Sequence, residues 1–210
     1  GKEGKGIVPV VGSTVGKPHD YLSDRVFVYL KVDTDDNVAM DADVRALREA
    51  GHPRVTIQLK DAYAIAGEFF RWEFATAVAG KILGINAFDE PNVTESKDNT
   101  KRLLDHFKEH GSWFTPEPVI TEKGVKLFAD ENTLRPLRQL AAQHGYHGDS
   151  IAGLLEAQLN ATHAGDYFAI LAFAAPSDEL TAAMNDVRRR LRHVTHRAVT
   201  VGYGPRYLHS

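Results

Sequence analysis

The chain has 210 residues, 43% of them hydrophobic and 25% charged, and its 28 acidic and 25 basic residues give a net charge of −3. This is the composition of an ordinary globular protein, and it gives no reason to expect nucleic acid or a membrane as a partner. No apolar run approaches the ~18 residues of a membrane span. The absence of cysteine excludes disulfides and thiol chemistry and fits a cytoplasmic location.

Five segments are predicted to be strands, because each is a short run of β-branched, aromatic or aliphatic residues. In chain order they are residues 7–11, 25–32, 54–59, 166–173 and 198–202. The fourth is almost continuously apolar, which is typical of a strand covered on both faces.

Helical patterns separate these strands, at residues 41–50, 62–83, 92–110 and 180–194. The last has apolar residues at spacings of three and four. We interpret its four arginines as a solvated outer side, although they would also suit an anionic sugar phosphate. These are Arg188, Arg189, Arg190 and Arg192. Strands separated by helices predict an α/β fold, a three-layer sandwich with a mainly parallel sheet between helices.

Residues 114–165 depart from this alternation. Pro116 and Pro118 exclude a helix at the start, and apolar pairs on either side of residues 122–124 predict a small hairpin. Two short helices follow, near residues 134–143 and 151–159. We expect a single domain over residues 1–210 with residues 114–165 as an insertion.

Candidate site residues are scattered along the chain. The pairs His144/His147 and His193/His196 have the spacing of metal ligands on a helix, but each needs a third ligand from elsewhere, so we predict no metal site from them. Glu68, Arg71 and Glu73 interrupt an apolar helix, where a charge must be paired or must face a cleft. The residues alone leave both alternatives open, including a pair between Arg71 and Glu73.

The last nine residues are unusually rich in glycine, aromatic residues and arginine for a chain terminus. They follow a predicted strand, and the crevice beyond the carboxyl ends of parallel strands is where α/β proteins bind ligands. Arg206 can hold a phosphate or carboxylate, and His209 can transfer protons. The alternative is a frayed tail.

Residues 51–104 resemble the glucose-6-phosphate isomerases. Residues 51–59 are similar to the family strand that precedes a long helix, and residues 66–80 to that helix, including its aromatic-glutamate pair Trp72-Glu73 and Gly80. Ile85-Asn86-Ala87-Phe88-Asp89 is close to the family's Ile-Asn-Ser-Phe-Asp, and Val93 and Lys97 match its next helix.

The two ends resemble a narrower group, the bacterial bifunctional transaldolase/glucose-6-phosphate isomerase fusions. Residues 1–6 and the Gly-Tyr-Gly-Pro-Arg-Tyr-Leu-His-Ser of residues 202–210 carry this likeness. The resemblance implies the second of two sugar-isomerase (SIS) domains, acting on glucose 6-phosphate and fructose 6-phosphate through a cis-enediol without metal or organic cofactor. The implied partners are the sugar phosphate, the first SIS domain and a transaldolase domain, and a homo-oligomer is left open.

The family's catalytic glutamate lies in a Glu-Ser-x-Gly-Lys motif, and by this resemblance it would stand just before Gly1. The family's ring-opening histidine motif is absent, and His19 does not match it. We therefore leave the catalytic residues unassigned, with His209 as a candidate. Lys2, Arg206 and His209 are expected at the substrate pocket, and Glu73, Arg71 and Lys97 in supporting roles. The chain alone is expected to be inactive; the alternative is a non-catalytic module that binds sugar phosphates.

Overall fold

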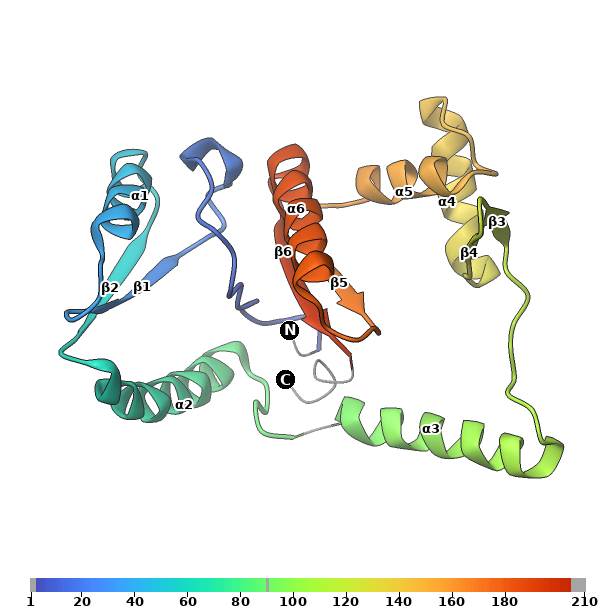
Figure 1. The fold of residues 1–210 in the computed structure, drawn as a ribbon, viewed down its shortest axis with the longest axis horizontal. Helices are drawn as coiled ribbons and strands as arrows, with labels where there is room; N and C mark the ends of the chain where they lie inside the picture. Colours follow the sequence, from blue (N-terminus) through green and yellow to red (C-terminus); the bar gives the residue numbers. More distant parts are fainter. Residues whose placement is uncertain (1–2, 90, 205–210) are drawn as a thin grey trace. The chain divides into compact units, whose positions relative to one another are not determined.

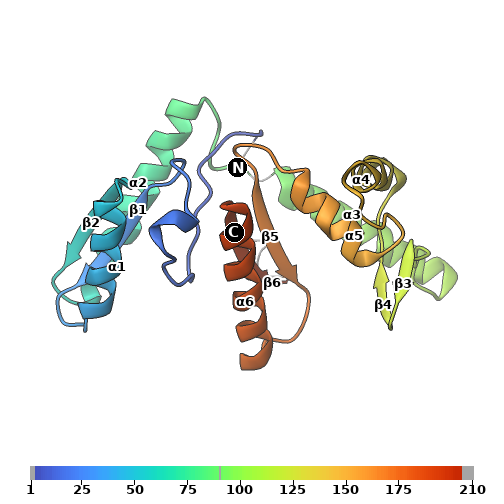
Figure 2. The same cartoon turned by 90° about the horizontal axis from the view of Figure 1, so that it is seen from above.

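The computed structural model describes residues 3–89 and 91–204. The chain divides into two compact units, one made of residues 1–90 and 167–210 and the other of residues 91–166 (Figures 1 and 2). None of the described helices combines the length and the hydropathy that crossing a membrane requires.

The first unit contains two β-α-β elements. In the first, helix α1 (Val38–Glu49) connects the parallel strands β1 (Phe27–Val32) and β2 (Arg54–Leu59). In the second, helix α6 (Asp178–Thr195) connects the parallel strands β5 (Tyr167–Ala172) and β6 (Ala198–Tyr203). The short helices η1 (Pro18–Asp20) and η2 (Ala62–Ala64) and the long helix α2 (Ile65–Leu83) complete it. The predicted α/β class with parallel strands is confirmed.

The predicted parallel strands form two separate two-stranded sheets in the described part of the chain. The prediction of a strand at residues 7–11 is wrong, because this segment has no regular structure. Pro9 lies in the middle of the run and has no N–H to donate to a strand partner. The carbonyl of Val11 accepts a hydrogen bond from Arg188 instead.

The second unit contains α3 (Pro91–His110), β3 (Ile120–Glu122), β4 (Val125–Leu127), α4 (Glu131–His144) and α5 (Ile151–Asn160). The predicted hairpin is present, and its two-residue turn places Lys123 and Gly124 at positive φ, as a type I′ turn requires. A small core of Ile120, Leu134 and Leu154 joins the hairpin to both short helices. The unit begins earlier than the predicted insertion, because α3 belongs to it.

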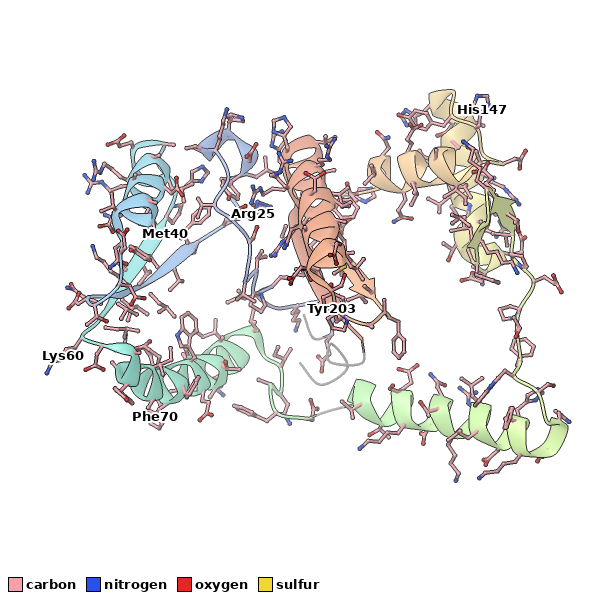
Figure 3. All side chains as sticks on the ribbon, viewed as in Figure 1. Arg25, Met40, Lys60, Phe70, His147 and Tyr203 are labelled. Atoms are coloured by element: carbon pink, nitrogen blue, oxygen red, sulfur yellow. The ribbon has the colours of Figure 1, made fainter. Side chains whose placement is uncertain are left out.

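Large apolar surfaces of the first unit are exposed. The β1–β2 pair turns its polar side chains toward α1, while Val28, Leu30 and Val55 on the opposite face are 38–48% exposed. Helix α2 is predominantly apolar, yet of its residues only Glu68 and Gly80 are buried. Figure 3 shows Phe70 projecting from this helix. Helices that are apolar all round are normally buried on several sides.

Candidate functional site

Buried charges mark one region of the first unit, between the loop of residues 11–25 and helix α6. Four polar or charged residues are identified as buried in the described part of the chain, and Asp20, Arg188 and Arg192 lie in this region. Burying a charge is costly unless it is paired or hydrogen-bonded. The contacts of these three side chains therefore define the candidate site.

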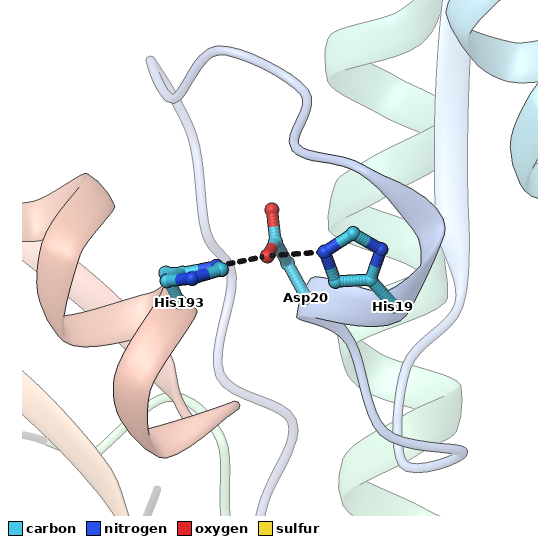
Figure 4. A group of neighbouring side chains, drawn as sticks. All are labelled: His19, Asp20 and His193. Carbon is cyan, nitrogen blue, oxygen red and sulfur yellow. Dashed lines mark hydrogen bonds and ion pairs between the residues drawn. The ribbon is translucent and has the colours of Figure 1, made fainter.

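The Asp20 carboxylate joins η1 to α6 (Figure 4). Its Oδ1 lies 2.8 Å from Nδ1 of His193 and 3.7 Å from Nε2 of His19, and its Oδ2 accepts a hydrogen bond of 3.0 Å from the Lys17 amide. Burial acts to raise the pKa of Asp20, but the hydrogen bonds from His193 and Lys17 and the charge of Arg192 outweigh it, so the pKa lies below its ordinary value. Asp20 is therefore ionised at neutral pH.

Two arginines of α6 hold the N-terminal loop by its backbone. Arg188 donates from Nε to the Val199 carbonyl at 2.9 Å and from Nη2 to the Val11 carbonyl at 2.8 Å. Arg192 donates from Nη1 to the Thr14 carbonyl at 2.8 Å, and its guanidinium lies over the Tyr21 ring. Burial, and then the charge of Arg192, lower the pKa of Arg188 below its ordinary value.

The interpretation of all four arginines as a solvated outer side of α6 is therefore wrong for two of them. Arg189 and Arg190 are exposed and pair with Asp186, whereas Arg188 and Arg192 are buried. The spacing carries a signal for this difference. Arg188 and Arg192 follow the buried Met184 at intervals of four, so all three share one face of the helix.

Gly16 allows the loop to approach these side chains. A Cβ at this position would lie 2.6 Å from both Nη2 of Arg192 and Oδ2 of Asp20. We expect Gly16→Ala to lower the free energy of unfolding by about 1 kcal/mol, because the ends of two flexible side chains must move. Urea unfolding measures this effect, and an unchanged or raised stability would contradict it.

A second polar region is a hollow of about 300 Å³ between α1 and the β1–β2 pair. It is lined by Tyr29, Lys31, Asp41, Val44, Arg45, Arg48, Arg54, Thr56 and Gln58. Nζ of Lys31 lies 2.7 Å from Oδ2 of Asp41. This hydrogen bond is the main reason why the pKa of Lys31 lies above its ordinary value. Four cations face one carboxylate, which suits an anionic group such as phosphate. The sequence interpretation missed this hollow; its signal is three arginines along α1 and the start of β2.

The predicted supporting residues lie on the helices α2 and α3. Arg71 is exposed on α2, and its Nη1 lies 3.4 Å from Oε1 of the buried Glu68. Arg71 thus pairs with Glu68 and not with Glu73, which is exposed on the same helix. Lys97 is exposed on α3 in the second unit. The predicted pocket residues Lys2, Arg206 and His209 lie outside the described residues.

No protein-family model, no curated protein and no solved structure matches the chain. The function must therefore be inferred from the chain's own residues and from the sequence resemblance.

Proposed function

We propose that this chain is part of a glucose-6-phosphate isomerase, contributing the second of its two SIS domains. The enzyme would interconvert glucose 6-phosphate and fructose 6-phosphate through a cis-enediol. The sequence resemblance is strongest over residues 84–97. The observation that carries the proposal is the geometry at the end of α2, where the matching residues Gly80, Ile85, Asn86 and Phe88 each have a defined contact.

This segment ends α2 and leads into α3. Gly84 has a φ of 68°, and the Ile85 amide donates to the Gly80 carbonyl at 3.0 Å. This is the hydrogen bond of a Schellman helix end. The Asn86 side chain accepts from the Phe88 amide at 3.0 Å, which forms a local turn.

Gly80 permits the close approach of this turn to α2, because a Cβ there would lie only 3.2 Å from the Ala87 Cβ. The helix end and the turn after it thus depend on four residues, Gly80, Ile85, Asn86 and Phe88. We expect a family motif of this kind to preserve this backbone geometry. The segment supports membership of the scaffold. It does not itself supply a catalytic group.

The uncovered apolar surfaces support the finer fold that the proposal implies. In a three-layer sandwich, both faces of a parallel sheet are covered by helices. The exposed face of Val28, Leu30 and Val55, and the apolar helix α2, would be covered when the sheet is complete and the first SIS domain is present. The proposed partners of the chain are that domain and a transaldolase domain of the same polypeptide. The proposed location of the enzyme is the cytoplasm.

Aldose–ketose isomerisation needs a carboxylate that removes the proton at C2 and returns it at C1, with cationic or hydrogen-bonding groups beside the enediolate. The proposal assigns the base to a glutamate just before Gly1. It assigns the pocket rim to Lys2 and Arg206, and leaves His209 as a candidate for proton transfer. The substrate is the sugar phosphate, and no metal or organic cofactor takes part in these steps.

A second candidate function is a non-catalytic module that binds sugar phosphates. The arginine-lined hollow beside α1 favours it, because this hollow has cations for a phosphate but only Asp41 as a carboxylate, and Asp41 is paired with Lys31. The isomerase would convert the sugar phosphate, whereas the binding module would bind it without converting it.

The test compares the full-length protein with the 210-residue chain, using fructose 6-phosphate and a coupled glucose-6-phosphate dehydrogenase. We expect turnover by the full-length protein and none by the chain alone. Turnover by the chain that persists through repurification would contradict the placing of the base before Gly1. A full-length protein without turnover would contradict the isomerase proposal. If it still binds fructose 6-phosphate, and Arg48→Ala weakens that binding, the second candidate is favoured.

A further inference from the structure

His19, Asp20 and His193 bring three metal-type ligands together. One ring nitrogen from each histidine and one carboxylate oxygen all lie within 4.8 Å of one another, and the described residues contain no other such group. Asp20 and His193 are 173 positions apart in the sequence. The group is therefore assembled by the fold, and no helical spacing of histidines could have predicted it.

The two distances from Asp20 are close to those of a coordination sphere. Zinc binds nitrogen and oxygen ligands at about 2.0–2.2 Å, so neighbouring ligand atoms of a tetrahedral site are about 3.3 Å apart. The two distances from Asp20 Oδ1, 2.8 Å to His193 and 3.7 Å to His19, lie on either side of this value. Small movements of the two rings would accommodate an ion. Both histidine side chains are more than 60% exposed, so an ion can enter from solvent.

The carboxylate that would anchor the ion is already held in place. Asp20 is 7% exposed, and its second oxygen is fixed by the Lys17 amide. The loop is fixed in turn by His52, whose Nε2 lies 3.0 Å from the Pro18 carbonyl oxygen. Such outer contacts orient the ligands of metal sites.

The charge of the group suits a divalent cation. Two neutral imidazoles and one carboxylate give −1, and histidine with carboxylate favours transition metals over calcium or magnesium. The charge of the nearby Arg192 opposes binding. Its Nη1 donates to Ser13 and Thr14 and its guanidinium lies over the Tyr21 ring, so these contacts leave the Asp20 Oδ1 to the two histidines. A hydrogen bond that merely joins η1 to α6 needs only His193. It does not explain why a second imidazole, that of His19, faces the same oxygen.

We propose that His19, Asp20 and His193 bind one zinc-class divalent ion, with water completing the coordination. The ion would link the N-terminal loop to helix α6. This site is independent of the proposed isomerase chemistry, which uses no metal.

The test is zinc titration of the chelator-treated protein by calorimetry, together with its melting temperature with and without zinc. His19→Ala is the decisive variant, because His19 makes no hydrogen bond within the described residues. Without zinc it should melt like the wild type. It should also bind zinc at this site at least about tenfold more weakly, and most of the zinc-induced rise in melting temperature should be lost. Asp20→Asn should likewise lose one bound equivalent.

The control is the double variant His106→Ala/His110→Ala. These two rings lie one turn apart on α3, with centroids 4.3 Å apart, and could chelate an ion without the proposed site. The control should keep the equivalent that His19→Ala loses. X-ray absorption of the zinc-loaded control should show two imidazole ligands. The proposal is overturned if His19→Ala binds zinc as tightly as the wild type. It is also overturned if the His106→Ala/His110→Ala control loses a zinc equivalent that His19→Ala retains.

Discussion

Arg188→Ala is expected to lower the free energy of unfolding of the first unit by about 3 kcal/mol. Arg188 is 5% exposed and makes hydrogen bonds to the carbonyls of Val11 and Val199. Hydrogen bonds from a charged donor contribute roughly 1.5–3 kcal/mol each, and a buried acceptor that loses its partner adds a desolvation cost. Chemical denaturation of the wild type and the variant measures the difference.

The matched control is Arg189→Ala, one position further along α6. Arg189 is exposed and pairs with Asp186 at the surface, so its loss should change the stability by no more than about 0.5 kcal/mol. Equal effects of the two substitutions would show that Arg188 is solvated like its neighbour. That result would refute the attachment of the N-terminal loop to α6.

Gly153→Ala is expected to destabilise the second unit by about 2 kcal/mol. Gly153 is buried in the first turn of α5. A Cβ there would lie 2.7 Å from the carbonyl carbon of His147 and 2.9 Å from the backbone nitrogen of His147. Those atoms belong to the backbone of the preceding turn and cannot rotate away, so α5 must shift. The shift would also disturb the packing of Leu154 against Leu134 and Ile120. A thermal or urea unfolding curve of the variant reports it.

Gly67→Ala in α2 is the control, because a Cβ there would meet nothing within 4 Å. Alanine is favoured over glycine in a helix by up to about 1 kcal/mol, so this variant should be more stable than the wild type. Opposite signs for the two substitutions are the expected outcome. A stabilising Gly153→Ala would mean that α5 does not lie against residue 147.

Local patterns were sufficient for most of the elements. The helical segments predicted at residues 62–83 and 92–110 correspond to η2 with α2 and to α3, and the hairpin appears around residues 120–127. These features depend on side-chain periodicity and on residues that end or turn the chain, such as Gly84 and Gly124, and these act over a few positions. The missing strand at residues 7–11 shows the limit, because Pro9 interrupts a run whose apolar content is otherwise typical of a strand.

The candidate site depended on contacts that no local pattern encodes. Hydrophobic spacing and glycine positions act locally, and they were enough to predict the helices, the hairpin and the two parallel β-α-β elements. The burial of Arg188 and Arg192, and the contact of His193 with Asp20 and His19, depend on the tertiary structure. Those pairings join segments more than 170 positions apart. The energy of such a contact depends on burial and on the partner that the fold supplies.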